Sequence, residues 1–195
     1  MKVNILIVGV GGQGTLLASR VLGEFASGRN LDCKLSEVHG MAQRGGSVVT
    51  HVKIADKVYS PIIAEGDADI ILAFEELEAL RARHCLKDKG MMIINSQQIF
   101  PMPVITGAAS YPQGILQKII GEGIKVESLD ALEIASECGN IKAANTVMLG
   151  RMVKIMGIPL EELQGVLRRV IPERFIDVNI KAAQAGHEVS NDIQP

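Results

Sequence analysis

The chain has 195 residues, enough for one core of ordinary domain size, so we expect a single domain over residues 1–195. Hydrophobic residues make up 47% of the chain and charged residues 22%, with 20 Lys and Arg against 22 Asp and Glu. This balance is typical of a soluble globular protein and argues against a disordered or polybasic one, so nucleic acid is not an expected partner.

The N-terminal segment predicts the start of a parallel sheet. Residues Val3 to Val8 are almost all apolar and lead into glycines, as in a strand that is buried on both faces. The run is too short for a signal peptide or a spanning helix, so we expect no membrane association and a cytoplasmic protein. Apolar residues recur at helical spacing from Gln13 to Ser27, and Cys33 to Ser36 offers a second strand. This order predicts a right-handed strand–helix–strand unit.

The next segment predicts an antiparallel insertion. Ser47 to Ile54 places apolar residues and Thr50 alternately on one face, and Val58–Tyr59 would form the return strand of a β-hairpin. Strand and helix patterns then alternate again. The strands are expected at Ile70–Phe74, Met91–Asn95 and Lys125–Ser128, and the helices at Glu75–His84 and from Pro112 to Ile120.

Helical patterns fill the C-terminal third, at Ile141–Met156, Leu160–Val170 and about Glu173–Ala185, and Gly186 is expected to end the last helix. An apolar stripe on the first of these helices is interpreted as core packing, with a partner interface as the alternative. Its members are Val147, Met148, Met152, Val153 and Met156. The predicted fold class is therefore α/β: a Rossmann-like, mostly parallel sheet with helices on both faces, a β-hairpin insertion and a helical C-terminal third.

The cysteines do not predict a metal centre. Cys33, Cys85 and Cys138 are widely spaced, whereas zinc and iron–sulfur sites normally show close pairs such as C-x-x-C. We expect no metal site, no cluster and no catalytic thiol in this chain, and we interpret the three cysteines as small buried apolar residues.

A glycine-rich turn follows the first predicted strand. Gly9 to Gly14 satisfies G-x-G-x-x-G between a strand and a helix, where glycines admit a phosphate to backbone N–H groups and to the positive end of the helix. The candidate binding residues of this turn are Gly9, Gly11, Gly12, Gln13, Gly14 and Thr15. A tight turn that binds nothing is the alternative. For a dinucleotide, Glu37 or Asp32 would have to hold the ribose, and either can equally be an ordinary surface carboxylate.

A second glycine-rich segment surrounds one arginine. His39 to Ser47 holds Arg44, Gly45 and Gly46 in a loop that should open at the carboxyl end of the sheet, near the first turn. A guanidinium beside exposed backbone N–H groups suits a phosphate or a partner's carboxylate. The alternative is a loop whose glycines only allow a sharp entry to the hairpin.

Three further titratable residues are expected to be structural. His51 lies on a predicted strand with no nucleophile or matched carboxylate that can be placed near it. Glu75 and Glu76 begin a predicted helix, where carboxylates favour the helix dipole.

Three motifs together resemble a known family. They are G-V-G-G-Q-G from Gly9, S-E-V-H-G-M-A-Q-R-G-G-S-V-V-T-H-V from Ser36, and N-T-V-M-L-G from Asn145. The chain resembles the gamma subunit of 2-oxoacid:ferredoxin oxidoreductases over nearly its whole length. Its length and its M-A-Q-R-G-G segment are most similar to the indolepyruvate oxidoreductase beta-subunit branch of that family.

The resemblance implies a heteromeric enzyme. Such a complex decarboxylates a 2-oxoacid on thiamine diphosphate, passes electrons through iron–sulfur clusters to ferredoxin and transfers the acyl group to coenzyme A. This chain lacks the G-D-G motif expected for thiamine diphosphate and magnesium. The resemblance therefore implies a larger partner that carries thiamine diphosphate, magnesium and the clusters, with this chain inactive alone and lining a shared coenzyme A cleft. A dimer of heterodimers is one arrangement that it allows.

Two other functions remain open from the residues themselves. A stand-alone NAD(P)-dependent oxidoreductase is permitted by the glycine motif but shows no evident catalytic constellation. A non-catalytic nucleotide-binding or scaffolding module would bind without affecting turnover. No residue of this chain is expected to act as acid, base or nucleophile.

Overall fold

The computed structural model describes residues 1–40 and 45–189, and six strands form one sheet in the order β2-β3-β1-β4-β5-β6. The parallel part consists of β1 (Val3–Val10), β4 (Ala68–Ala73), β5 (Leu86–Asn95) and β6 (Lys125–Leu129). These strands lie where the apolar runs predicted them, and the glycine-rich turn therefore leaves the sheet at its carboxyl end.

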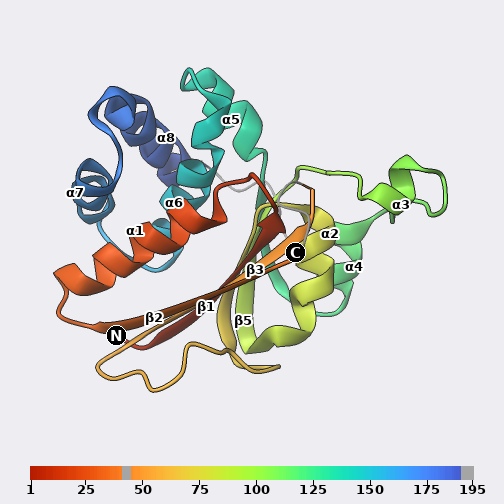
Figure 1. Cartoon of the computed structure of the whole chain (residues 1–195), viewed down its shortest axis with the longest axis horizontal. Coiled ribbons are helices and arrows are strands. Elements are labelled where there is room, and N and C mark those ends of the chain that lie inside the picture. The colour runs from red at the N-terminus through yellow and green to blue at the C-terminus, as the bar shows by residue number, and fades with distance from the viewer. Residues whose placement is uncertain (41–44, 190–195) are drawn as a thin grey trace.

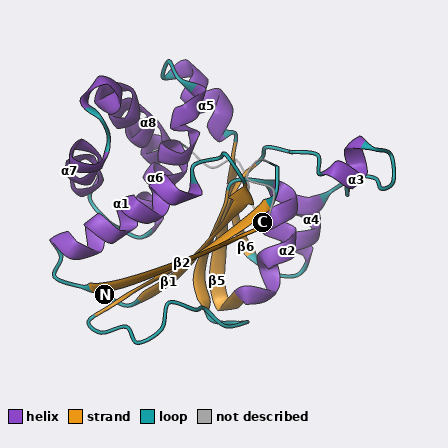
Figure 2. Cartoon of the chain, in the orientation of Figure 1, coloured by secondary structure: helices purple, strands orange, loops and turns teal. Residues whose placement is uncertain are grey.

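Helices cover both faces of the sheet (Figure 1, Figure 2). One side carries α1 (Thr15–Gly28), α5 (Ala131–Glu137), α6 (Ala144–Ile155), α7 (Leu160–Val170) and α8 (Ile176–Glu188). The other side carries α2 (Glu76–Ala82) and α4 (Ile115–Gly121), and the short α3 (Met102–Ile105) projects from the body on a loop. The 3-10 turns are η1 (Arg83–Cys85), η2 (Ile141–Ala143) and η3 (Glu173–Phe175).

Strand β1 belongs to two hydrophobic cores because both of its faces are buried. Ile5 and Ile7 pack into the core beneath α1 and the C-terminal helices, whereas Leu6 and Val8 pack into the core beneath α2 and α4. The apolar stripe predicted on α6 lies in the first of these cores, which confirms the core-packing interpretation. No helix in the described ranges is both long and apolar enough to span a bilayer.

The hairpin insertion is present, but its partner strand was predicted wrongly. Strand β3 (Ser47–Ala55) pairs antiparallel with β1 on one side and with β2 (Asp32–His39) on the other, so β2 is not adjacent to β1. The segment Val58–Tyr59 is not a strand, because the Val58 amide donates to the Asp32 Oδ2 atom at 2.9 Å instead of entering a ladder. The alternation in β3 is confirmed, since every second residue is buried.

Two helix ends also differ from the prediction. Helix α4 begins at Ile115 with Gly114 as its left-handed cap, so Pro112 precedes the helix instead of starting it. Helix α8 runs through Gly186 to Glu188. A Cβ atom on Gly186 would lie 2.0 Å from the Val147 carbonyl oxygen, so this glycine allows two helices to approach and does not end one. Helix α5, which was not predicted, is capped by Asp130.

Candidate functional site

The structure brings together the two glycine-rich segments. The Gly11 amide donates to the Gly46 carbonyl oxygen at 2.8 Å, and the Gly45 amide donates to the Gly11 oxygen at 3.5 Å. These bonds continue the pairing of β1 with β3 beyond the ends of both strands. Gly45 and Gly46 therefore lie beside the first turn, as the sequence predicted, whereas Arg44 lies outside the described residues.

The turn itself depends on left-handed backbone. Gly12 has a φ of 105° and Gly14 a φ of 85°, in the region that side chains with a Cβ atom rarely adopt. The space around Gly12 is open, whereas a Cβ atom on Gly14 would lie 2.4 Å from Asn145 Nδ2. The amides of Gly12 and Gly14 donate to no acceptor on another described residue. The buried Thr15 then begins α1, which has no side-chain cap. The turn thus presents free N–H groups at a helix N-terminus.

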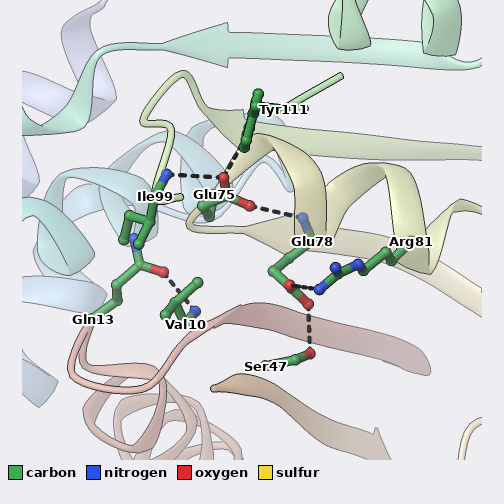
Figure 3. Close-up of polar contacts among 8 residues, drawn as sticks. All are labelled: Val10, Gln13, Ser47, Glu75, Glu78, Arg81, Ile99 and Tyr111. Carbon is green, nitrogen blue, oxygen red and sulfur yellow. Dashed lines mark hydrogen bonds and ion pairs between the residues drawn. The ribbon is translucent and has the colours of Figure 1, made fainter. Parts of the chain in front are cut away.

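The side chain of Gln13 points inward and fixes the turn. Its Oε1 atom accepts from the Val10 amide at 2.7 Å, as Figure 3 shows, and its Nε2 atom donates to the Phe74 carbonyl oxygen at 2.7 Å and to Gln97 Oε1 at 2.9 Å. A Cβ atom on Gly9 would lie 2.8 Å from that same Oε1 atom. Gly9 and Gln13 therefore shape the turn through contacts within the protein. The side-chain amide of Gln13 is already hydrogen-bonded to other residues of this chain.

A pocket of about 480 Å³ opens beside the turn. Its lining comes from three parts of the chain: the turn (Gly12, Gln13 and Gly14), the ends of β4 and β5 (Phe74, Asn95 and Gln97), and α5, η2 and the start of α6 (Leu132, Ile141, Lys142, Ala144 and Asn145). The sequence prediction missed Asn95, Gln97 and Lys142 as lining residues. Asn95 and Gln97 could have been predicted from their position, because they lie at the end of a buried strand, where open α/β sheets bind ligands.

A buried carboxylate supports the floor of this region. Glu75 is 1% exposed, and its Oε2 atom accepts from the Glu78 amide at 2.9 Å, which caps α2. Its Oε1 atom accepts from the Ile99 amide at 3.1 Å and from the Tyr111 hydroxyl at 2.6 Å (Figure 3). Burial and the bond to Glu75 raise the pKa of Tyr111. The expected structural role of Glu75 at a helix start is confirmed, and this residue also holds both ends of the loop that carries α3.

A second carboxylate fixes the start of β3. The Ser47 hydroxyl donates to Glu78 Oε2 at 2.5 Å, and Arg81 Nη1 lies 2.6 Å from Glu78 Oε1 (Figure 3). Because Ser47 follows Gly46 directly, this contact anchors the base of the second glycine segment. Nearby Glu76 is 7% exposed, and burial raises its pKa.

The remaining candidates lie away from the pocket. His51 Nδ1 accepts from the Ile63 amide at 3.2 Å, and burial lowers the pKa of this histidine, which fits a structural role. Glu37 accepts from the Thr50 hydroxyl, and both Glu37 and Asp32 are separated from β1 by the whole of β3. A dinucleotide site of the usual kind needs the acidic strand next to the first strand, so this geometry disfavours one.

The described cysteines are not assembled into a metal site. Cys33, Cys85 and Cys138 are free thiols that pack against the cores but are only partly buried, so the interpretation of them as buried residues is wrong. No group of three potential metal ligands occurs within residues 1–40 and 45–189. Burial raises the pKa of the thiols of Cys33 and Cys85, which favours their neutral form.

Comparison with known proteins gives consistent matches along nearly the whole chain. Residues 4–189 match the pyruvate ferredoxin/flavodoxin oxidoreductase family. The indolepyruvate oxidoreductase subunit IorB of Thermococcus kodakarensis is 40% identical over 195 residues, covering 97% of this chain and 96% of the relative.

Two solved structures share the fold. The gamma subunit of a keto/oxoacid ferredoxin oxidoreductase from Geobacter sulfurreducens aligns with a TM-score of 0.71 at 25% identity, over 95% of this chain and 96% of the other. A 2-oxoglutarate:ferredoxin oxidoreductase from Magnetococcus marinus, described with 2-oxoglutarate, coenzyme A and succinyl-CoA bound, aligns with a TM-score of 0.73 at 17% identity. The alignment covers 95% of this chain and 30% of that larger one, and it shows the fold alone.

Proposed function

Because this chain belongs to the pyruvate ferredoxin/flavodoxin oxidoreductase family, we propose that it is the small subunit of a heteromeric 2-oxoacid:ferredoxin oxidoreductase acting on indolepyruvate or a related arylpyruvate. Residues 1–195 form one gamma-type domain in this proposal, and the complex works in the cytoplasm. The larger partner carries thiamine diphosphate, magnesium and the iron–sulfur clusters, and through them reduces ferredoxin.

The observation that carries this proposal is the joining of the two glycine segments. The bond from the Gly11 amide to the Gly46 oxygen holds both at the carboxyl end of the sheet, where Gly12, Gln13 and Gly14 line the pocket but Gly11 and Gly46 do not. In open α/β sheets this end is where ligands bind. A cleft completed by a second subunit at this end would be lined by Gly11, Gly12, Gln13 and Gly14 from one segment and by Arg44, Gly45 and Gly46 from the other.

Coenzyme A fits the chemistry of this region. Its phosphates are anionic, and the amides of Gly12 and Gly14 just before α1 are donors without an acceptor on another described residue, with open space beside Gly12. When bound, coenzyme A supplies the thiol that accepts the acyl group. In this proposal the chain's own residues bind and orient the phosphates, Arg44 adds a fixed positive charge, and Gln13 keeps the turn in shape.

A stand-alone NAD(P)-dependent oxidoreductase is the weaker candidate. The insertion of β3 between β1 and β2 moves Glu37 away from the position where an acidic residue would hold the ribose. A fluorescence titration of the purified chain with NADH tests this alternative, and we expect no saturable change.

Reconstitution tests the proposed function. The purified chain, the purified thiamine-type partner and their mixture are each assayed for ferredoxin reduction with indolepyruvate and coenzyme A. We expect the chain to be inactive alone and the mixture to be active, with iron found only in the partner. Oxidation of the oxoacid by the chain alone, or no increase in the partner's activity on mixing, would overturn the proposal.

A further inference from the structure

Strand β2 ends the sheet on one side, with no strand beyond it among residues 1–40 and 45–189. It is eight residues long and pairs with β3 residue for residue from Asp32 to His39, without a bulge. The strand at the opposite edge, β6, has only five residues. Proteins usually keep edge strands short or interrupted, because an open edge can pair with another chain. The β2 edge is neither short nor interrupted.

The hydrogen-bond pattern shows which backbone groups of β2 face outward. The Gly11 amide bonds to the oxygen of Gly46, which lies opposite, so the even-numbered residues of β3 bond to β1. The odd-numbered residues of β3 therefore bond to β2, and the 3.4 Å bond from the Gly40 amide to the Ser47 oxygen agrees. Since bonded and outward residues alternate along a strand, the N–H and C=O groups of Leu35 point away from the sheet. They can bond to a further strand.

Two apolar side chains of β2 are exposed. Leu35 is 42% exposed and Val38 is 57% exposed. Leu35 lies on the face that α1 covers, because a Cβ atom on Gly23 would be 3.7 Å from its Cδ1 atom. Val38 lies on the opposite face, since successive side chains of a strand alternate. A further strand beside β2 would shield both side chains from water, and the hydrophobic effect favours this.

We propose that β2 pairs antiparallel with β2 of a second copy of this chain, around a two-fold axis at Leu35. A two-fold axis perpendicular to the sheet joins two identical edge strands into one continuous sheet. Directly opposite residues of an antiparallel pair point to the same face. Each residue of β2 therefore lies opposite itself or opposite a residue an even number of positions away.

The charges of β2 limit where the axis can lie. An axis at Lys34 would place two ammonium groups directly opposite each other, and an axis at Glu37 would place two carboxylates so. Like charges in these positions destabilise a strand pair. An axis at Leu35 places Lys34 opposite Ser36 and Glu37 opposite Cys33 of the second copy, so neither charge meets its like directly.

The apolar side chains favour Leu35 over the neighbouring position. With the axis at Leu35, the two leucines pack against each other, and each Leu35 amide donates to the Leu35 oxygen of the other copy. An axis at Ser36 would set Leu35 opposite the carboxylate of Glu37. The strand is thus complementary to itself in its backbone groups, its charges and its exposed leucine.

This surface is separate from the pocket, because none of the described residues that line the pocket belongs to β2. The inference therefore goes beyond the proposed function and does not depend on it. One pair of edge strands makes a small interface compared with permanent dimers. The dimer is accordingly reversible and depends on protein concentration.

Sedimentation velocity of the full-length chain, over a roughly hundredfold range of concentration, tests the dimer. Leu35→Pro removes an outward N–H group and leaves the bonds to β3 intact, and Leu35→Lys adds a charge at the axis. We expect both changes to weaken dimerisation at least about tenfold in a chain that melting shows to be folded. Tyr59→Lys, at a residue that is 89% exposed and lies outside β2, is the control and should dimerise normally.

A chain that stays monomeric at every concentration, or a dimer that persists in Leu35→Lys, would overturn the proposal. The Leu35→Lys protein decides the outcome if proline prevents folding.

Disulfide trapping tests the position of the axis. Opposite residues of a hydrogen-bonded antiparallel pair have Cα atoms about 5.5 Å apart, which a disulfide can bridge. With diamide as the oxidant, Leu35→Cys should give a covalent dimer on a non-reducing gel. Ser36→Cys is the matched control, and the unmodified chain gives the background of the three native cysteines. Equal trapping in the two variants would contradict an axis at Leu35.

Discussion

Two regions of the molecule use glycine for opposite reasons. At the carboxyl end of the sheet, Gly12 and Gly14 adopt left-handed backbone, and the space around Gly12 is open. Between α6 and α8, Gly150 and Gly186 lie within helices, and a Cβ atom on either would lie 2.1 Å or 2.0 Å from a carbonyl oxygen of the facing helix. The turn at the end of the sheet needs residues with a positive φ, whose amides are left without an acceptor. The contact between α6 and α8 needs residues without a side chain.

The two regions are also stabilised differently. The carboxyl end of the sheet contains buried carboxylates, Glu75, Glu76 and Glu78, each with hydrogen-bond partners. The α6–α8 contact lies among buried alanine, valine and methionine side chains. We therefore expect substitutions that change side-chain volume to lower the stability of the helical layer. In the site region, we expect stability to depend on hydrogen bonds, on backbone strain and on pH.

The largest effect is expected in the helical layer. Gly186→Ala would force α6 and α8 apart, because the new methyl group overlaps the Val147 carbonyl oxygen. We expect a loss of about 3 kcal/mol in the free energy of unfolding, measured by urea denaturation. Gly165→Ala is the matched control. That glycine lies in α7, and a Cβ atom added to it would have its nearest neighbouring atom 4.0 Å away, so alanine should stabilise by roughly 0.5–1 kcal/mol. Equal effects of the two changes would contradict the close-approach explanation.

A smaller loss is expected beneath the pocket. Tyr111→Phe removes the hydroxyl that donates to Glu75 Oε1 and leaves a buried carboxylate with one donor fewer. We expect a cost of about 1–3 kcal/mol in thermal or urea unfolding. Tyr59→Phe serves as the control, because Tyr59 is 89% exposed. A Tyr111→Phe protein as stable as the Tyr59→Phe protein would show that the Glu75 contacts do not support this region.

The sequence predicted the parts of this contrast that depend on local pattern. The buried strands, the alternation in β3 and the bounds of α7 follow from hydrophobic periodicity, and the glycine turn follows from its place between strand and helix. The position of β2 was missed because strand order depends on long-range pairing, which the local pattern around Cys33 does not contain.

Gly186 shows most clearly what the local sequence pattern could not predict. Gly186 was expected to end a helix because glycine after a helical pattern usually does so, and only the packing of α8 against Val147 reveals its other use. Within the site, Lys142 was missed because its partners in space come from the start of the chain. Asn145 stood out in the sequence only as the first residue of a motif, with no contact that pointed to Gly14.

A third substitution, Gly12→Ala, distinguishes the effect of backbone strain on stability from an effect on ligand binding. Gly12→Ala places a Cβ atom on left-handed backbone in open space, so we expect a stability cost of about 1–2 kcal/mol. Gly107→Ala is a matched control, since Gly107 has a φ of 77° and equally open surroundings on the loop near α3. Both variants should lose similar stability in melting experiments, and only Gly12→Ala should weaken the binding of titrated adenosine 3′,5′-bisphosphate. Unchanged binding in Gly12→Ala would remove this turn from the phosphate site.

The smallest effect is a pH dependence of the site region. Burial raises the pKa of Glu76 above the ordinary value of 4.5, so the folded state binds its proton more tightly than the unfolded state. The stabilising contribution of this group is complete below that ordinary value and is lost as the pH rises through the folded pKa. Glu76→Gln should therefore gain stability relative to the unmodified protein as the pH rises through the folded pKa of Glu76, measured by urea unfolding at several pH values. A stability difference that does not change with pH would contradict the burial effect.

We propose that the glycine turn and the glycine-flanked Arg44 form the coenzyme A side of a cleft shared with a larger subunit. The most direct test is the KM for coenzyme A of the reconstituted complex carrying Arg44→Ala, measured by ferredoxin reduction with saturating indolepyruvate. We predict a KM raised at least about fivefold, as expected for the loss of a charge-assisted phosphate contact. A KM equal to that of the unmodified complex would contradict the claim.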